Sequence, residues 1–274
     1  MSKLMIIGSS HVGAYKNAAE AFARAYPDID VSFFAMRGPL FLMGSMDDAG
    51  TFTPSFRNDK DRAFVRETNG AELAHTDGID HLLLVGHRFA FGNLTSLLQD
   101  HDVLEGVRTG RAKLISEGLL KEIIENVAVT SVGEALAQLN GYEKPVTFAM
   151  APYPASSIVV RAKNYEMARL LELFWGRPDA AWVFELWLDH VRQALADKGH
   201  ALLVQPDAVN AGHFATKPEF ADRAASGDGD KLNNTDHRHM NADFGLAMLH
   251  AYAENHLGLA PQETAKATLN ERIA

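Results

Sequence analysis

The sequence has no cysteine among its 274 residues. A disulfide framework, a thiolate metal site and a thiol nucleophile are therefore all excluded. If the chain carries a nucleophile, it must be a serine, a threonine, a lysine or a carboxylate. The search for a reactive centre accordingly concerns hydroxyl, amine and carboxylate side chains.

Long apolar runs and basic clusters are also missing. No apolar stretch approaches the roughly 20 residues that span a bilayer, and the opening KLMIIG lacks the features of a signal peptide. The formal net charge is -9, with no run of Lys or Arg, which argues against binding to nucleic acid or anionic lipid. We expect a cytoplasmic protein whose partner is a small molecule, without nucleic acid or membrane.

What is present is a repeated alternation of two patterns. Short apolar runs of strand length occur at residues 3–8, 30–36, 81–86, 146–152 and 201–206. Helical periodicity follows most of them, most clearly over 12–26, 161–175, 179–198 and 242–256. Strands alternating with helices predict βα units around a parallel sheet covered on both faces, which is an α/β fold.

We expect a single domain over residues 1–274, with insertions at about 38–78 and 206–235. Both insertions leave the carboxyl end of a predicted strand. Ligands of open parallel sheets bind outside those ends, so the two segments are predicted to form the walls of a pocket.

The segment IIGSSHVGAY, residues 6–15, joins the first strand to the first helix. A phosphate loop would need Lys and Ser or Thr where Ala14 and Tyr15 stand. A dinucleotide loop would need a middle glycine and an acidic residue ending the second strand, where Met36 stands. A hydrolase elbow would need glycine in place of Val12. All three motifs fit poorly.

Ser10 remains as a candidate nucleophile by position. It lies at the carboxyl end of a predicted strand and the N-terminus of a predicted helix, where free amides and the helix dipole favour an oxyanion. The alternative is that Ser9 or Ser10 only caps the helix.

A candidate base lies near the other end of the sequence, in NNTDHRHMNADFG. Asp236 and His239 are spaced so that the carboxylate can orient the imidazole while the other ring nitrogen faces a nucleophile. Two alternatives stay open: a solvated turn capped by Asp236, and metal binding by His237 and His239. The second is weak, because two histidines without cysteine or clustered carboxylates are a poor zinc signal.

Together, IIGSSHVGAY and DHRHMNADFG resemble the end motifs of the SGNH, or GDSL-like, hydrolase superfamily. The resemblance implies a three-layer α/β/α sandwich with a central, mainly parallel sheet of about five strands, as in flavodoxin. It also implies ester hydrolysis through an acyl-enzyme, without cofactor or metal, by Ser10 as nucleophile, His239 as base and Asp236 as its partner. The GSSH form further resembles SGNH domains attached to acyltransferases, so an acyltransferase that uses the same triad is an alternative that stays open.

The same resemblance implies an oxyanion hole and a substrate. Gly38 in FFAMRGPLF matches the backbone donor of the family's second block, whereas VGHRFAFGN departs from its third block. Arg88 replaces the expected asparagine there, so His87, Arg88 or Asn93 would have to donate instead. The implied substrate is a small acyl ester, with acetylated sugar as the leading class.

Two further functions remain open: a catalytically silent module that binds a glycan or small acid in the same cleft, and a flavin- or nucleotide-binding protein. Arg88, if it faces the pocket, favours an anionic substrate group. The aromatic residues of the two predicted helices over 161–198 suggest core packing or a contact between subunits of a homo-oligomer. These residues are Trp175, Trp182, Phe184 and Trp187.

Overall fold

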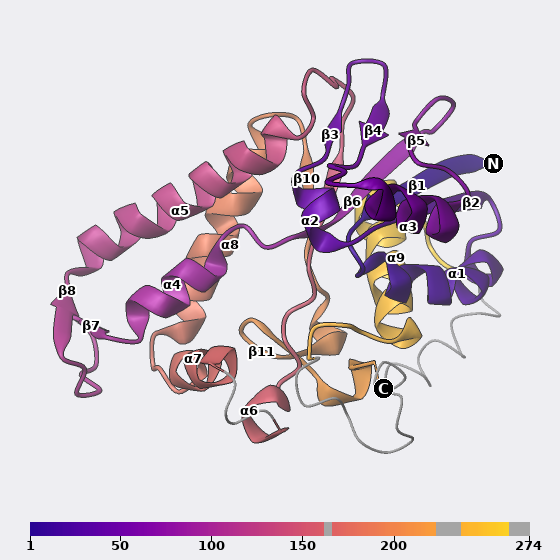
Figure 1. Ribbon diagram of the computed structural model, residues 1–274. Coiled ribbons are helices and arrows are strands. Elements are labelled where there is room, and N and C mark those ends of the chain that lie inside the picture. The colour runs from indigo at the N-terminus through magenta and orange to yellow at the C-terminus, as the bar shows by residue number, and fades with distance from the viewer. Residues whose placement is uncertain (162–165, 223–236, 263–274) are drawn as a thin grey trace.

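The computed structural model describes residues 1–161, 166–222 and 237–262. At its centre lies a sheet of five parallel strands in the order β10-β9-β6-β1-β2 (Figure 1). These strands are β1 (Ser2–Gly8), β2 (Ile29–Ala35), β6 (His81–His87), β9 (Thr147–Met150) and β10 (Ala201–Leu203). Counted along the chain, the order is 2-1-3-4-5, the flavodoxin-like arrangement. The predicted α/β class with a parallel five-stranded sheet is confirmed.

The five strands lie at their predicted positions, with two shortened. The predicted strand over 146–152 ends at Met150, and the one over 201–206 ends at Leu203. Both predicted runs close on a proline, Pro152 and Pro206, whose missing N–H cannot join a ladder. The additional apolar residues lie in the loops that leave the sheet.

Side chains of alternate strand residues face opposite layers. On β1, Leu4 and Ile6 belong to one buried cluster, and Ile7 belongs to another. Since successive Cβ atoms of a strand point to opposite faces, a run that is apolar at every position produces a sheet buried on both sides.

Two helices cover the first face. They are α1 (Val12–Ala25) and α9 (Ala242–Leu257), which lie against each other (Figure 1). Gly245 of α9 approaches the backbone of α1 so closely that a Cβ there would lie 2.1 Å from the Ala14 carbonyl oxygen. No described helix is long and apolar enough to cross a membrane.

The opposite layer includes a group of helices that extends beyond the sheet (Figure 1). It contains α4 (Phe91–Leu98), α5 (Glu117–Ala137), α7 (Glu166–Trp175) and α8 (Ala180–Ala196), with the short helix α6 (Ile158–Arg161) before α7. Of the predicted aromatic group, Trp187 and Phe184 are buried in the core. Core packing is thus confirmed for these two residues.

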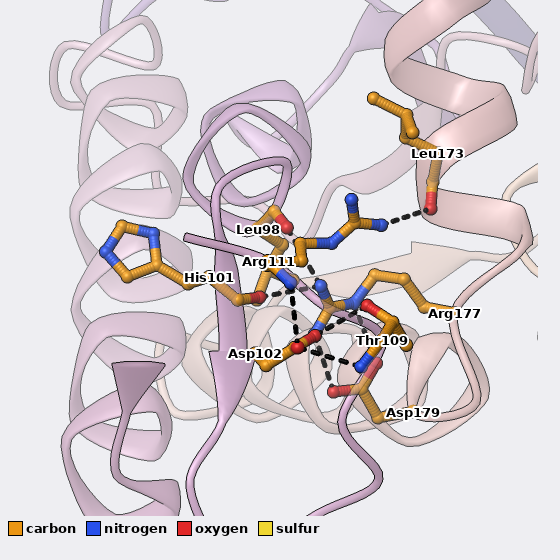
Figure 2. Close-up of polar contacts among 8 residues, drawn as sticks. All are labelled: Leu98, His101, Asp102, Thr109, Arg111, Leu173, Arg177 and Asp179. Atoms are coloured by element: carbon orange, nitrogen blue, oxygen red, sulfur yellow. Dashed lines mark hydrogen bonds and ion pairs between the residues drawn. The ribbon is translucent and has the colours of Figure 1, made fainter. Parts of the chain in front are cut away.

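A short parallel ladder of β7 (His101–Val103) and β8 (Lys113–Ile115) lies at the tip of this extension. The loop between them closes on Asp102, whose carboxylate accepts from the Thr109 hydroxyl at 2.6 Å and from the amides of Thr109 and Arg111 (Figure 2). It also accepts from the Gly110 amide. These bonds, the one from the hydroxyl first, lower the pKa of Asp102 to about 2.

Arg177, in the turn between α7 and α8, connects this turn to the end of α4 and the start of β7. Its guanidinium donates to the carbonyls of Leu98 and His101 at 2.8 Å each and forms a two-pronged ion pair with Asp179 (Figure 2). Arg177 is buried, and hydrogen bonds to these partners replace the hydration that its guanidinium loses on folding.

The two segments predicted as insertions contain small elements. Residues 38–78 hold α2 (Gly38–Leu42), α3 (Asp59–Asn69) and an antiparallel sheet of β3 (Ser45–Met46), β4 (Thr51–Thr53) and β5 (Ala74–His75). The described part of the second segment holds the hairpin of β11 (Asn210–Gly212) and β12 (Ala215–Thr216), flanked by the short 3-10 helices Asp207–Val209 and Pro218–Phe220.

Candidate active site

Ser10 lies in the turn between β1 and α1, at the carboxyl edge of the sheet. The turn is fixed by hydrogen bonds from the Ser9 amide to Val85 O and from the Met36 amide to Gly8 O, each at 3.0 Å. Gly8 permits this close passage, since a Cβ at that position would lie 2.1 Å from the Val85 carbonyl oxygen. Ser10 therefore lies between the ends of β2 and β6, where the strand order of the sheet reverses.

Neither serine caps the following helix. The N-cap residue of α1 is His11, and no side chain makes the capping hydrogen bond. Ser9 is buried, and Gly86, with a φ of +128°, makes room for its hydroxyl. Ser10 is exposed instead, so the alternative of a structural cap is wrong for both residues.

His239 reaches Ser10 from the other end of the chain. Its Nε2 lies 2.8 Å from the Ser10 Oγ, although the two residues are 229 positions apart. This separation is within the range for a nucleophile and its general base. The structure thus brings together two of the three residues predicted for the triad.

The segment that carries His239 is tied down on both sides. The His239 carbonyl accepts from the Asp222 amide at 2.9 Å, and Met240 pairs with Ala221 as an antiparallel bridge. Asn241 then caps α9 by accepting from the Phe244 amide. Together with the close packing of α9 on α1, these contacts hold the imidazole at the start of α1.

A cavity of about 300 Å³ opens beside the pair. Its lining residues are Ser10, His11, Gly13, Ala14, Asn17, Asp222, His239 and Met240. The His11 ring lies 5.4 Å from the His239 ring, centroid to centroid. Asp222 is the one carboxylate in this lining, and Asn17 adds an exposed amide. The site therefore offers a nucleophile, a base and further polar groups in one depression.

The remaining predicted residues lie in other surroundings. Asp236, the predicted partner of His239, lies outside the described residues. Gly38 begins α2, three residues after the end of β2, which pairs with β1 in register from Ser2 to Gly8. Arg88 and Asn93 each line a different cavity from that of Ser10.

His87 is buried in the opposite layer among aromatic rings. Its ring stacks on Phe89 and meets Phe41 and Phe148 edge to face. Its Nε2 bonds to the Gln138 side chain at 3.2 Å. Burial lowers the pKa of His87 to about 4, against a smaller opposing effect of Gln138, so the imidazole is neutral at pH 7.

The alternative of a metal site at His237 and His239 finds no additional ligand among the described residues. No three His, Asp or Glu side chains are grouped there so as to hold a metal ion. His237 is buried, with its carbonyl accepting from the Ala155 amide, whereas His239 faces Ser10.

Three lining residues were missed by sequence reasoning: His11, Asn17 and Asp222. Asp222 lies within the 206–235 segment that was predicted as a pocket wall, but nothing in its local pattern singles it out. His11 and Asn17 are six positions apart, at the start of α1 and on its second turn. The sequence signal that could have identified His11 and Asn17 is their place near the N-terminus of the helix that follows Ser10, which is predicted to face a ligand.

A scan against protein-family models and a search of curated proteins find no match to this sequence. Among solved structures, a DUF4886 family protein from Bacteroides uniformis ATCC 8492 is 12% identical, with a TM-score of 0.38, over 99% of this chain and 93% of that chain. A carbohydrate esterase family 2 enzyme plus carbohydrate binding domain from Corynascus thermopiles (Myceliophthora fergusii) is 12% identical, with a TM-score of 0.36, over 94% and 67%.

The lipopolysaccharide acetyltransferase periplasmic domain of Salmonella ser. Paratyphi A is also similar. It is 11% identical, with a TM-score of 0.38, over 93% of this chain and 83% of that chain. Likeness at these values says nothing about the reaction of this chain, so its function has to be inferred from its own residues.

Proposed function

We propose that this protein is a serine hydrolase that cleaves an ester of a small molecule through an acyl-enzyme. The observation that carries the proposal is the 2.8 Å contact between Ser10 Oγ and His239 Nε2 beside an open cavity. A serine hydroxyl is a weak nucleophile until an adjacent base takes its proton, and His239 is placed to do so.

The reaction follows from this geometry in two halves. Nε2 of His239 accepts the Ser10 proton as Oγ attacks the ester carbonyl, which forms a tetrahedral oxyanion. This intermediate collapses by breaking its bond to the alcohol oxygen. The departing alcohol takes the proton from His239, and the acyl group stays on Ser10. Water then loses a proton to His239 as its oxygen attacks the acyl carbonyl. The second tetrahedral intermediate breaks its bond to Ser10 Oγ, which takes the proton back from His239 as the acid leaves.

The oxyanion needs donors, and the proposal uses two backbone amides. Ser10 precedes α1 and Gly38 begins α2, at the ends of two adjacent strands. The Gly38 amide lies in the first turn of α2, where it has no acceptor within the helix and is available to an oxyanion, and the Ser10 amide lies two residues ahead of the first residue of α1. One such donor can supply about 3 kcal/mol of transition-state stabilisation.

The partner of His239 remains the predicted Asp236. An acceptor at Nδ1 would fix the tautomer that leaves Nε2 free to take a proton from Ser10. Asp222 lines the same cavity, so its carboxylate is the alternative to Asp236 that has to be tested for this role.

The deciding experiment is the intact mass of the protein after reaction with a fluorophosphonate. Wild type should gain one adduct, and folded Ser10→Ala and His239→Ala variants should gain none. Ser9→Ala is the matched control, because the Ser9 hydroxyl is buried and has no hydrogen-bond partner among the described residues. It should label as wild type does. Folded wild type that gains no adduct would refute the proposal.

A further inference from the structure

A second cavity, of about 350 Å³, lies at the same edge of the sheet. Its walls come from the loops after β6 and β9, from α4 and α7, and from the β11–β12 hairpin. The lining residues are Arg88, Gly92, Thr95, Ser96, Pro154, Glu166, Met167, Leu170, Leu171 and Phe214. In size it falls within the range of about 300 to 1,000 Å³ that holds small ligands.

The topology places this cavity next to the candidate active site. β6 is hydrogen-bonded to β1, so Arg88 and Ser10 follow neighbouring parallel strands at the same edge. On the other side, the amide of Ala155, next to Pro154, donates to the carbonyl of His237 at 3.0 Å. Segments that carry the cavity walls thus adjoin those that carry Ser10 and His239.

Within the described residues, four non-glycine positions have a positive φ, and three of them lie in segments that form the cavity walls. Phe214, at 57°, lines the cavity itself, whereas Phe89 at 42° and Ala90 at 54° belong to the loop between Arg88 and α4, and Ala90 lines the neighbouring cavity of Asn93. Such conformations cost free energy and persist where the surroundings impose them, which happens most often at ligand sites. Here the Trp187 indole donates to the Phe89 carbonyl at 3.1 Å. The aromatic rings of Phe91 and Phe214 lie 4.4 Å apart, centroid to centroid.

The chemistry of the lining defines the ligand. Five of the ten residues are apolar, namely Pro154, Met167, Leu170, Leu171 and Phe214, and two more, Thr95 and Ser96, are uncharged. Arg88 and Glu166 contribute one charge of each sign, so the lining has no net formal charge. An aliphatic group matches this surface better than the anionic group that Arg88 alone would favour.

We propose that this cavity binds the aliphatic chain of the acyl group whose carbonyl is attacked by Ser10. This inference rests on the proposed serine hydrolase function and names its substrate class as esters with acyl chains longer than acetyl. An acetyl group has no further carbons with which to fill a cavity beside the reacting carbonyl. Each methylene group that enters should improve kcat/KM by about three- to fourfold.

Gly92 is an exposed position from which a side chain can fill the cavity. It is the second residue of α4, it lines the cavity, and a Cβ there would meet no heavy atom within 4 Å. Gly92→Leu should therefore fold and occupy the space. Gly118→Leu is the matched control, because Gly118 is the exposed second residue of α5 and is equally unobstructed. Ser96→Met, on the same rim, provides a second blocking variant.

Two measurements test the cavity separately from the catalysis. The first is kcat/KM for 4-nitrophenyl acetate, butyrate, hexanoate and octanoate. Hexanoate is four methylene groups longer than acetate, so kcat/KM should rise about 100-fold from acetate to hexanoate in wild type and Gly118→Leu. The rise should be lost in Gly92→Leu and Ser96→Met. The second is calorimetric binding of octanoate to Ser10→Ala, with and without Gly92→Leu, which requires no turnover.

The outcomes separate the two proposals. Octanoate binding that Gly92→Leu abolishes supports a site for an aliphatic chain in this cavity. If no ester is hydrolysed as well, the hydrolase proposal fails, and with it the assignment of that chain to an acyl group attacked by Ser10. A kcat/KM that does not change with chain length, or that both blocking variants leave unchanged, overturns the cavity proposal and leaves the hydrolase standing. Octanoate that fails to bind Ser10→Ala overturns it as well.

Discussion

Ser9 and Ser10 show how much one position matters. Ser9 is buried against Gly86 with its hydroxyl unused among the described residues, and Ser10, one position on, is exposed and contacts His239. The two serines follow β1 directly, and there Ser9 packs against Gly86 while Ser10 lines the cavity. Only the second serine can meet both a base and a substrate.

At this scale the first prediction concerns the partner of His239. Asp236→Asn should lower kcat by about 10³- to 10⁴-fold on an ester substrate, because an amide at that position favours the wrong tautomer of the imidazole. Asp222→Asn should lower it by less than tenfold. Stopped-flow or steady-state kinetics with folded variants would measure both effects. The reverse order would assign the orienting role to Asp222.

Between elements, the packing of α1 on α9 sets the distance from Ser10 to His239. Gly245 is the point of closest approach, facing the Ala14 carbonyl. A side chain here cannot be accommodated without separating the helices, since the obstacle is backbone.

Gly245→Ala should therefore destabilise the protein by about 1 to 3 kcal/mol, measured as the free energy of unfolding in urea. It should also lower kcat in the fraction that stays folded. Gly133→Ala, at an exposed and unobstructed glycine of α5, should stabilise by about 0.5 to 1 kcal/mol. Equal effects of the two substitutions would contradict the role given to this contact.

The free energy of unfolding should depend on pH through His250, a residue of α9 at the same interface. Its Nδ1 lies 3.1 Å from the Tyr26 hydroxyl, and burial lowers the pKa of His250 to about 4, against about 6.5 when unfolded. Between these values the unfolded chain binds the extra proton. The free energy of unfolding should thus be greatest above pH 6.5 and fall as the pH falls toward 4.

Urea unfolding at several pH values, compared with His250→Gln, isolates this contribution. The slope due to one histidine is at most about 1.4 kcal/mol per pH unit, and the variant should lose it while His87 keeps its own. Parallel curves for wild type and variant over pH 4 to 6.5 would show that His250 is not the responsive group.

At the scale of the whole molecule, the helical extension is held together partly through Arg177, whose partners Leu98, His101 and Asp179 all lie within it. Arg177→Met would leave two carbonyls and the Asp179 carboxylate without their donor in a buried setting, at an expected cost of about 3 kcal/mol in the free energy of unfolding. Arg192→Met, which removes an exposed ion pair with Asp189, should cost less than about 1 kcal/mol. A urea midpoint shifted equally by both would argue against this tie.

The sheet could be predicted from sequence because strands buried on both faces are apolar at nearly every position. Ser10 and His239 could be predicted from motifs at strand and helix ends. The closeness of Gly245 to Ala14, the burial of His87 against Gln138 and the second cavity could not, because each depends on contacts between segments far apart in the sequence. Local patterns fix elements, whereas such contacts are set by packing.

The 229 positions that separate Ser10 from His239 have a consequence for synthesis of the chain on the ribosome. The first strand and helix emerge early, but the base arrives only with the segment that begins α9. A nascent or prematurely terminated chain that stops before His239 has the serine without its base, however well its sheet is formed. The Ser–His pair can therefore form only after the segment that carries His239 has been synthesised.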